Sequence, residues 1–168
     1  MLYRLGAVFL VALSLVQPTW AEPSDLPQPD GRPILTVTGH IDVTNRAGQA
    51  VFDRDLLKTL PQKRVVTATD WTEGDQVFEG PLLSDLLTRI SADGAELRAT
   101  ALNDYSVTIP FSDAAEHRVL LALRRNGEAM RVRDKGPIWV IYPRQSAGSG
   151  PGLHNEKMIW QLRQLHVQ

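Results

Sequence analysis

The chain has 168 residues, of which 43% are hydrophobic and 22% charged; this is an ordinary composition for a soluble globular protein and excludes disorder throughout. A formal net charge of −1 leaves no excess of cations to neutralise phosphates, which argues against nucleic acid as a partner. The sequence contains no cysteine, so disulfide bonds, zinc–thiolate sites, iron–sulfur clusters and a cysteine nucleophile are all excluded.

Residues 1–21 have the pattern of a secretory signal peptide. Arg4 precedes an apolar block at residues 5–16, and the small residue Ala21 closes the segment. The apolar block is too short for a comfortable membrane span. We therefore expect cleavage after Ala21, no membrane span in the mature chain, and a periplasmic or secreted protein; an uncleaved membrane anchor is the alternative. Four prolines within residues 22–33 then predict an extended, mobile lead-in.

The remaining chain, residues 34–168, is expected to form one domain. In its first half, β-branched and apolar residues predict strands at 34–41, 64–69 and 76–79. Asp53 is a good N-cap for a short helix that Pro61 stops. Gly80-Pro81 predicts the start of a second helix, with an apolar face that packs in the core and an end at Gly94.

The second half of the domain is also rich in predicted strands, at 97–101, 105–109, 119–123 and 138–142. The last of these is apolar throughout, which is typical of a strand covered on both faces. Asn126-Gly127 is a strong hairpin signal, and residues 146–152 predict a flexible loop. Residues 158–167 predict a short turn and a final strand. The fold class that we expect is therefore α+β, a β-rich single domain with a few short helices.

No familiar catalytic motif or phosphate-binding loop is present, and the four histidines are too dispersed to predict a metal site. The candidate ligand-binding residues lie instead in polar loops at predicted strand ends, where ligand contacts are common. These loops supply aromatic faces, amides, carboxylates and cations. The candidates are Asp70, Trp71, Asn103, Asp104, Tyr105, Arg131, Arg133 and Lys135.

Each group of candidates has a purely structural alternative. Asn103 and Asp104 favour tight corners, so they could serve the turn alone. Large aromatic residues such as Trp71 usually pack in the core. The three cations at 131–135, beside a Gly-Pro turn, indicate a pocket for an anion, but they could equally be a solvated turn.

An ordered set of stretches covers most of residues 34–167, namely 35–39, 55–61, 78–87, 101–110, 121–130, 133–143 and 160–165. Taken together, this set resembles the oxidoreductase molybdopterin-binding domain, which is the fold of the sulfite oxidase family. The resemblance implies that fold for the whole domain. It also implies molybdopterin as the cofactor, an active-site tyrosine at Tyr105, and a metal-binding cysteine after the strand at 64–69.

The chain departs from the family at that cysteine, because Asp70-Trp71-Thr72 follows the strand and no cysteine exists anywhere. The family stretch before the closing strand is also altered, reading Gly152-Leu-His-Asn-Glu-Lys157. A thiolate is a soft, anionic ligand that helps set the geometry and redox potential of the metal. Molybdenum binding and oxygen-atom transfer of the sulfite oxidase kind are therefore not expected.

Three hypotheses follow for the function. The first is an exported binding module for a small anionic or pterin-type ligand, with Asn103, Tyr105 and Arg133 around one pocket. The second is a molybdopterin-dependent oxidoreductase that holds its metal without cysteine. The third is a periplasmic sensory or accessory domain that binds a partner protein.

Overall fold

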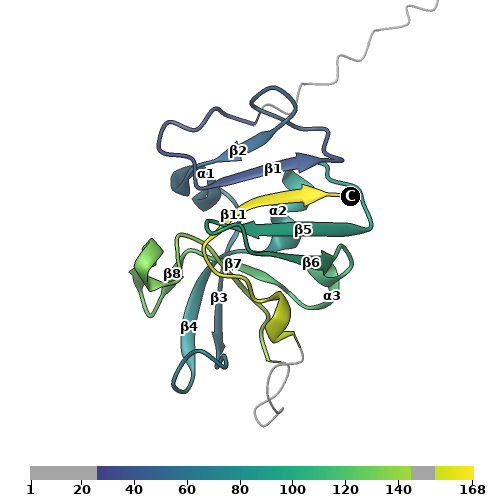
Figure 1. Ribbon diagram of the computed structural model, residues 1–168. Helices are drawn as coiled ribbons and strands as arrows, with labels where there is room; N and C mark the ends of the chain where they lie inside the picture. Colours follow the sequence, from purple (N-terminus) through teal and green to yellow (C-terminus); the bar gives the residue numbers. More distant parts are fainter. Residues whose placement is uncertain (1–25, 145–153) are drawn as a thin grey trace, which may run out of the picture.

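The computed structural model describes residues 26–144 and 154–168 (Figure 1). Its strands are β1 (Leu35–Gly39), β2 (Ala50–Phe52), β3 (Gln62–Thr67), β4 (Gln76–Pro81), β5 (Glu96–Ala101), β6 (Ser106–Pro110), β7 (Leu120–Ala122), β8 (Arg124–Arg125), β9 (Glu128–Ala129), β10 (Trp139–Ile141) and β11 (Leu162–Val167). Its helices are α1 (Arg54–Lys58), α2 (Leu83–Arg89) and α3 (Asp113–Glu116), with 3-10 turns η1 (Val132–Asp134) and η2 (Asn155–Lys157). This arrangement confirms the predicted β-rich α+β class.

Two predictions lie outside the described residues: the signal peptide at 1–21 and the flexible loop at 146–152. Over the two ranges that the structure describes, none of the helices is both long enough and apolar enough to cross a membrane.

A five-stranded sheet forms one part of the domain, in the order β2-β1-β11-β5-β6 (Figure 1). β1 and β11 pair in parallel, with Thr36 opposite Gln164, and the other neighbours are antiparallel. Leu35 and Val37 on β1 are buried, whereas Thr36 and Thr38 are only partly covered. This alternation is the pattern of a strand with one face on the core, and it confirms the first predicted strand.

The other part of the domain contains a four-stranded sheet, β3-β4-β8-β9, and the strand pair β7–β10. All residues of β7 and β10 are buried, as predicted for an apolar strand covered on both faces. Asn126 and Gly127 both have positive φ, +52° and +81°, at the turn between β8 and β9. The predicted hairpin is therefore present, with the backbone that this dipeptide favours.

The core divides into two clusters that follow these two parts. The larger cluster joins the inner face of the five-stranded sheet to α2, through Leu83, Leu86 and Leu87. The smaller cluster packs around Phe78 and Trp139, which are both fully buried. Since burial of each large apolar side chain stabilises a fold by roughly 1.5–3 kcal/mol, both parts have their own source of stability.

Asp53 begins α1 as predicted and also fixes the lead-in. Its carboxylate accepts hydrogen bonds from the backbone N–H of Leu56, at 2.7 Å, and of Gly31, at 2.6 Å. Those backbone hydrogen bonds hold the pKa of Asp53 below its usual value. Leu26 is buried, and Asn45 Nδ2 donates to the carbonyl of Pro27. The prediction of a mobile lead-in was therefore wrong for its described residues, because hydrogen bonds tie them to the domain.

The predicted helix from Gly80-Pro81 to Gly94 is shorter than expected. Both residues of the pair end β4, and α2 begins only after Leu82. A Cβ on Gly80 would lie 2.1 Å from the carbonyl oxygen of Leu121, so this glycine permits close approach of β4 and β7. Gly94 lies beyond the helix end at Arg89, and its Cβ would lie 2.5 Å from the oxygen of Gln168. Close packing explains both glycines, and neither of them marks an end of the helix.

Other differences are local. Residues 46–49 form a turn, with Arg46 bridged to Gln49. Two short elements were missed, β2 and α3. Residues 158–161 follow η2 as an irregular turn, and β11 begins at Leu162, which confirms the predicted turn and final strand.

Candidate functional site

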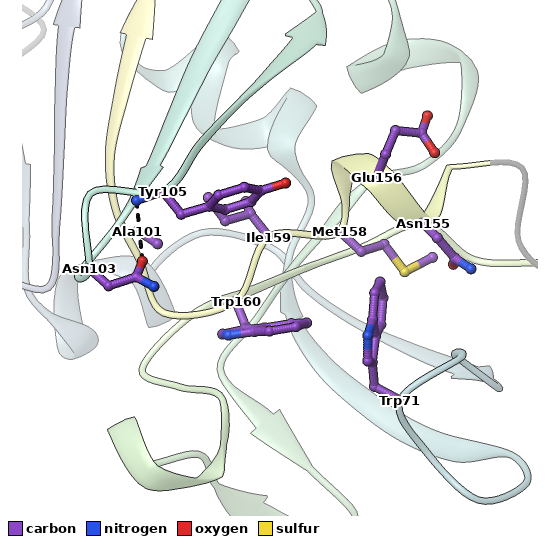
Figure 2. A pocket seen from close by; sticks show the side chains of 9 residues that line it. All are labelled: Trp71, Ala101, Asn103, Tyr105, Asn155, Glu156, Met158, Ile159 and Trp160. Atoms are coloured by element: carbon purple, nitrogen blue, oxygen red, sulfur yellow. Dashed lines mark hydrogen bonds between the residues drawn. The ribbon is translucent and has the colours of Figure 1, made fainter.

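A hollow of about 380 Å³ opens where three segments of the chain meet (Figure 2). We call it the aromatic pocket. One segment is the loop after β3, the second is the corner between β5 and β6, and the third leads through η2 into β11. The lining residues are Trp71, Ala101, Asn103, Tyr105, Asn155, Glu156, Met158, Ile159 and Trp160.

Two tryptophans form one wall of the pocket. The ring centroids of Trp71 and Trp160 lie 5.2 Å apart with their planes at 78°, an edge-to-face arrangement that Figure 2 shows from the side. Trp139 lies behind them, 6.3 Å from each ring, and Phe78 packs edge-on against it at 5.5 Å. Such pairs contribute about 0.5–1.5 kcal/mol beyond their area burial. Trp139 belongs to the core, whereas Trp71 is 37% exposed and offers its ring to the pocket.

Asn103 and Tyr105 enter the pocket from the opposite corner. Asp104 lies between them at φ +66°, and its carboxylate binds the guanidinium of Arg163. Arg163 Nε also donates to the carbonyl of Ala101, at 2.9 Å. Asp104 thus stabilises the corner, as its structural alternative proposed, and does not line the pocket. Tyr105 is 57% exposed, so its ring and hydroxyl are available to a ligand.

Asp70 holds the rim of the pocket together and does not line it. Its carboxylate accepts hydrogen bonds from Arg144 Nη2, at 3.3 Å, and from Asn155 Nδ2. The hydroxyl groups of Thr69 and Thr72, 3.0 Å apart, order the loop that carries Asp70 and Trp71. Asn155 keeps a second polar atom, Oδ1, that is buried and receives no hydrogen bond from any described residue. Asn155 lines the pocket, but this oxygen itself is shielded from solvent.

The charged turn does not join this pocket, which corrects the expectation for Arg133. Arg131 Nε lies 2.8 Å from Asp134 Oδ2 and Arg133 Nε lies 3.9 Å from it, so one carboxylate pairs with both cations. The side chain of Arg133 is 70% exposed. Lys135 instead contacts the pocket wall from outside, with Nζ 4.0 Å from the ring centroid of Trp160. Burial lowers the pKa of Lys135, and the nearby charge of Arg125 lowers it further.

A buried carboxylate anchors the third segment. Asp113 Oδ2 accepts hydrogen bonds from Tyr142 Oη, at 2.7 Å, and from Lys157 Nζ, at 2.8 Å. His117 Nε2 lies 3.8 Å from Asp113 Oδ1, and the ring of His154 packs on it at 4.5 Å. Burial alone would raise the pKa of Asp113, but the bonds from Lys157 and Tyr142 outweigh burial and lower it. Because Lys157 belongs to η2, this cluster fixes the residues that line the pocket.

Comparison with known proteins identifies the family. The model of the oxidoreductase molybdopterin binding domain matches residues 43–159, more than two thirds of the chain. The chain belongs to this family. Among solved structures, it is similar to the sulfane dehydrogenase SoxCD from Paracoccus pantotrophus, with 19% sequence identity and a TM-score of 0.60. That match covers 79% of this chain and 37% of the SoxCD chain, so this chain spans little more than a third of its length. No curated protein matches the chain.

The molybdenum cofactor of the family does not fit the described residues of the aromatic pocket. The sequence offers no thiolate, and the one sulfur in the lining is the neutral thioether of Met158. The one charged lining residue is Glu156, whose negative charge opposes an anionic dithiolene. Over residues 26–144 and 154–168, no group of three or more His, Cys, Asp or Glu side chains could hold a metal. We therefore derive no reaction through molybdenum.

Sequence reasoning missed the third segment of the pocket. Residues 155–160 supply five of the nine lining residues, yet they carry no catalytic or ligand-binding motif. The available signal was the family resemblance, in which Trp160 begins the closing strand. Trp71, Asn103 and Tyr105 were singled out, and the structure brings these three into one hollow.

Proposed function

We propose that this member of the family is an exported binding domain whose aromatic pocket takes a small, planar heterocycle of the pterin type, without a molybdenum–thiolate centre. The carrying observation is that the exposed side chains of Trp71 and Tyr105 line one hollow together with the amide of Asn103. A ring with N–H donors and acceptors at its edge hydrogen-bonds to that amide and stacks on the aromatic side chains at the same time.

The size and charge of the pocket support a neutral ring. A volume of about 380 Å³ falls in the range of sites for small molecules, roughly 300–1,000 Å³. The amide of Asn103 adds a donor and an acceptor, and Glu156 adds an acceptor. A small anion is disfavoured in this pocket, because Glu156 is its one charged lining residue. Of the two ligand classes considered from the sequence, the pterin type is thus the better supported here.

Titration with pterin itself tests this proposal, by calorimetry and by quenching of tryptophan fluorescence. Trp71→Ala is expected to weaken pterin binding about fivefold or more, since stacking of a ring on an aromatic residue contributes about 1–3 kcal/mol. Val66→Ala is the matched control, because Val66 is also an exposed apolar residue of this region, at 54%, but does not line the pocket.

The chemistry of the ligand is tested by quinoxaline, a bicyclic heteroaromatic ring without N–H donors. It is expected to bind more weakly than pterin, because it has no N–H donor for the oxygens of Asn103 and Glu156 in the lining. Equal binding of pterin by wild type and Trp71→Ala, or no binding at all, would contradict the proposal. A protein that binds no ring but copurifies with a specific protein would favour the accessory-domain hypothesis.

A further inference from the structure

A second cleft, of about 590 Å³, lies at the start of β1 and β11 and beside η1. It shares no lining residue with the aromatic pocket. Among the described residues, the charged ones that line it are all arginines, with no aspartate or glutamate. They come from four separate segments: the lead-in, α1, the residue before η1, and β11. We call this the arginine cleft, after Arg32, Arg54, Arg131 and Arg163.

Arg54 gives the cleft a fixed positive charge. Its Nη1 donates to the carbonyl of Leu123 and its Nη2 to that of Met130, both at 3.0 Å. These neutral carbonyls hold the guanidinium in place without cancelling its charge. Burial lowers the pKa of Arg54 and Asp55 partly offsets this, but no carboxylate of the described residues forms an ion pair with it. A half-buried cation without a charged partner favours a bound anion.

The other three arginines have N–H donors that do not bond to any described residue. A guanidinium has five N–H donors. Arg131 uses Nε toward Asp134, and Arg163 uses Nε and Nη2 toward Ala101 and Asp104. Arg32 is exposed and makes no hydrogen bond or ion pair with any described residue. Neither Asp134 nor Asp104 lines the cleft, and Arg32 and Arg54 form no ion pair with any described residue.

We propose that the arginine cleft binds a small oxyanion, a molecule carrying phosphate or carboxylate groups, with Arg54 as its fixed anchor and Arg32 and Arg131 closing on it from the surface. Arginine suits this role because its planar fork matches the oxygens of either group. Ile34, Leu35 and Pro137 line the same cleft and exclude water from one side of the ligand. This site is independent of the proposed pterin site.

Calorimetric titration of the mature protein with inorganic pyrophosphate, inorganic phosphate and citrate tests the site, at ionic strength held constant with chloride. Arg131→Gln and Arg32→Gln are each expected to weaken binding about tenfold or more, as for lost hydrogen bonds to charged groups. Both residues are exposed, so both variants should fold. Tighter binding of the phosphates assigns a phosphorylated ligand, and tighter binding of citrate a carboxylate.

Arg133→Gln is the matched control, since it removes the same charge two residues from Arg131 but does not line the cleft. It is expected to bind pyrophosphate as the wild type does. An equal loss in Arg133→Gln and Arg131→Gln would overturn the proposal, because diffuse attraction would then explain binding. No heat with any of the three anions would also overturn it. Trp71→Ala should keep anion binding, so failure at one site is distinguishable from failure at the other.

Discussion

Replacing Asp113 by asparagine is expected to lower the free energy of unfolding by about 3 kcal/mol. The change keeps the shape of the side chain but removes the negative charge that accepts from Tyr142 and Lys157. The Lys157 side chain is only 18% exposed, so its ammonium group is left without a charged partner and largely without water. Removing one partner of a fully buried pair costs about 3–5 kcal/mol, and the partial exposure of Lys157 places this pair at the lower end.

Urea unfolding followed by fluorescence measures this loss. With an m-value of about 2 kcal/mol/M for a domain of this size, the midpoint should fall by about 1.5 M. The double variant Asp113→Asn/Lys157→Met is expected to recover part of the loss, because it no longer buries an unpaired ammonium group. A midpoint shift below about 0.3 M for Asp113→Asn would refute the reasoning, since it would mean that the pair contributes almost nothing.

The same cluster predicts the response of stability to acid. The pKa of Asp113 is lowered in the folded protein, so its contribution is present above the unfolded value of 3.8 and is lost as pH falls below it. The pKa of His154 is lowered from 6.5, first by burial and then by the charges of His117 and Lys157. Folded protein therefore resists protonation of His154, and stability should already decline as pH falls through 6.5. In Asp113→Asn the lower of these two steps should disappear.

Two further predictions concern the fold and the export of the chain. Gly80→Ala should lower the free energy of unfolding in urea by about 3 kcal/mol, because the new Cβ meets the Leu121 carbonyl oxygen at 2.1 Å. The control Gly74→Ala, with no atom within 4 Å of its Cβ, should lower it by about 1 kcal/mol. Equal losses in the two variants would contradict the packing argument. Mass spectrometry of protein exported by a Gram-negative host should give a chain that begins at Glu22, and recovery of a chain that retains residues 1–21 would contradict the signal peptide.

Much of the fold follows from local patterns in the sequence. Alternation in β1, the run of buried residues in β10, the Asp53 cap and the Asn126-Gly127 turn each depend on a few neighbouring residues. Local patterns did not predict the packing role of Gly80 and Gly94. Each glycine permits contact with a chain segment that is distant in sequence, and that contact is invisible until the segments are brought together.

The two sites could be predicted only in part, again because each combines segments that are distant in sequence. Trp71 and Tyr105 could be singled out because unusual residues stand in loops, but Asn155 and Trp160 carry no local signal. They reach the pocket because the last strand, β11, pairs with β5, which leads into the corner that carries Asn103 and Tyr105. The cations at 131–135 suggested an anion pocket, which was expected next to Asn103 and Tyr105. The arginine cleft instead combines Arg131 with residues of three other segments. Arg131 belongs to it, whereas Arg133 does not.

The most direct test of the account is the molybdenum and pterin content of protein purified from a host that makes the molybdenum cofactor. With no thiolate in the sequence and Glu156 as the one charged lining residue of the aromatic pocket, molybdenum should be far below one atom per chain. Any bound pterin should lack the metal. One molybdenum atom per chain, held with its pterin dithiolene, would contradict the account and establish a molybdenum enzyme without a cysteine ligand.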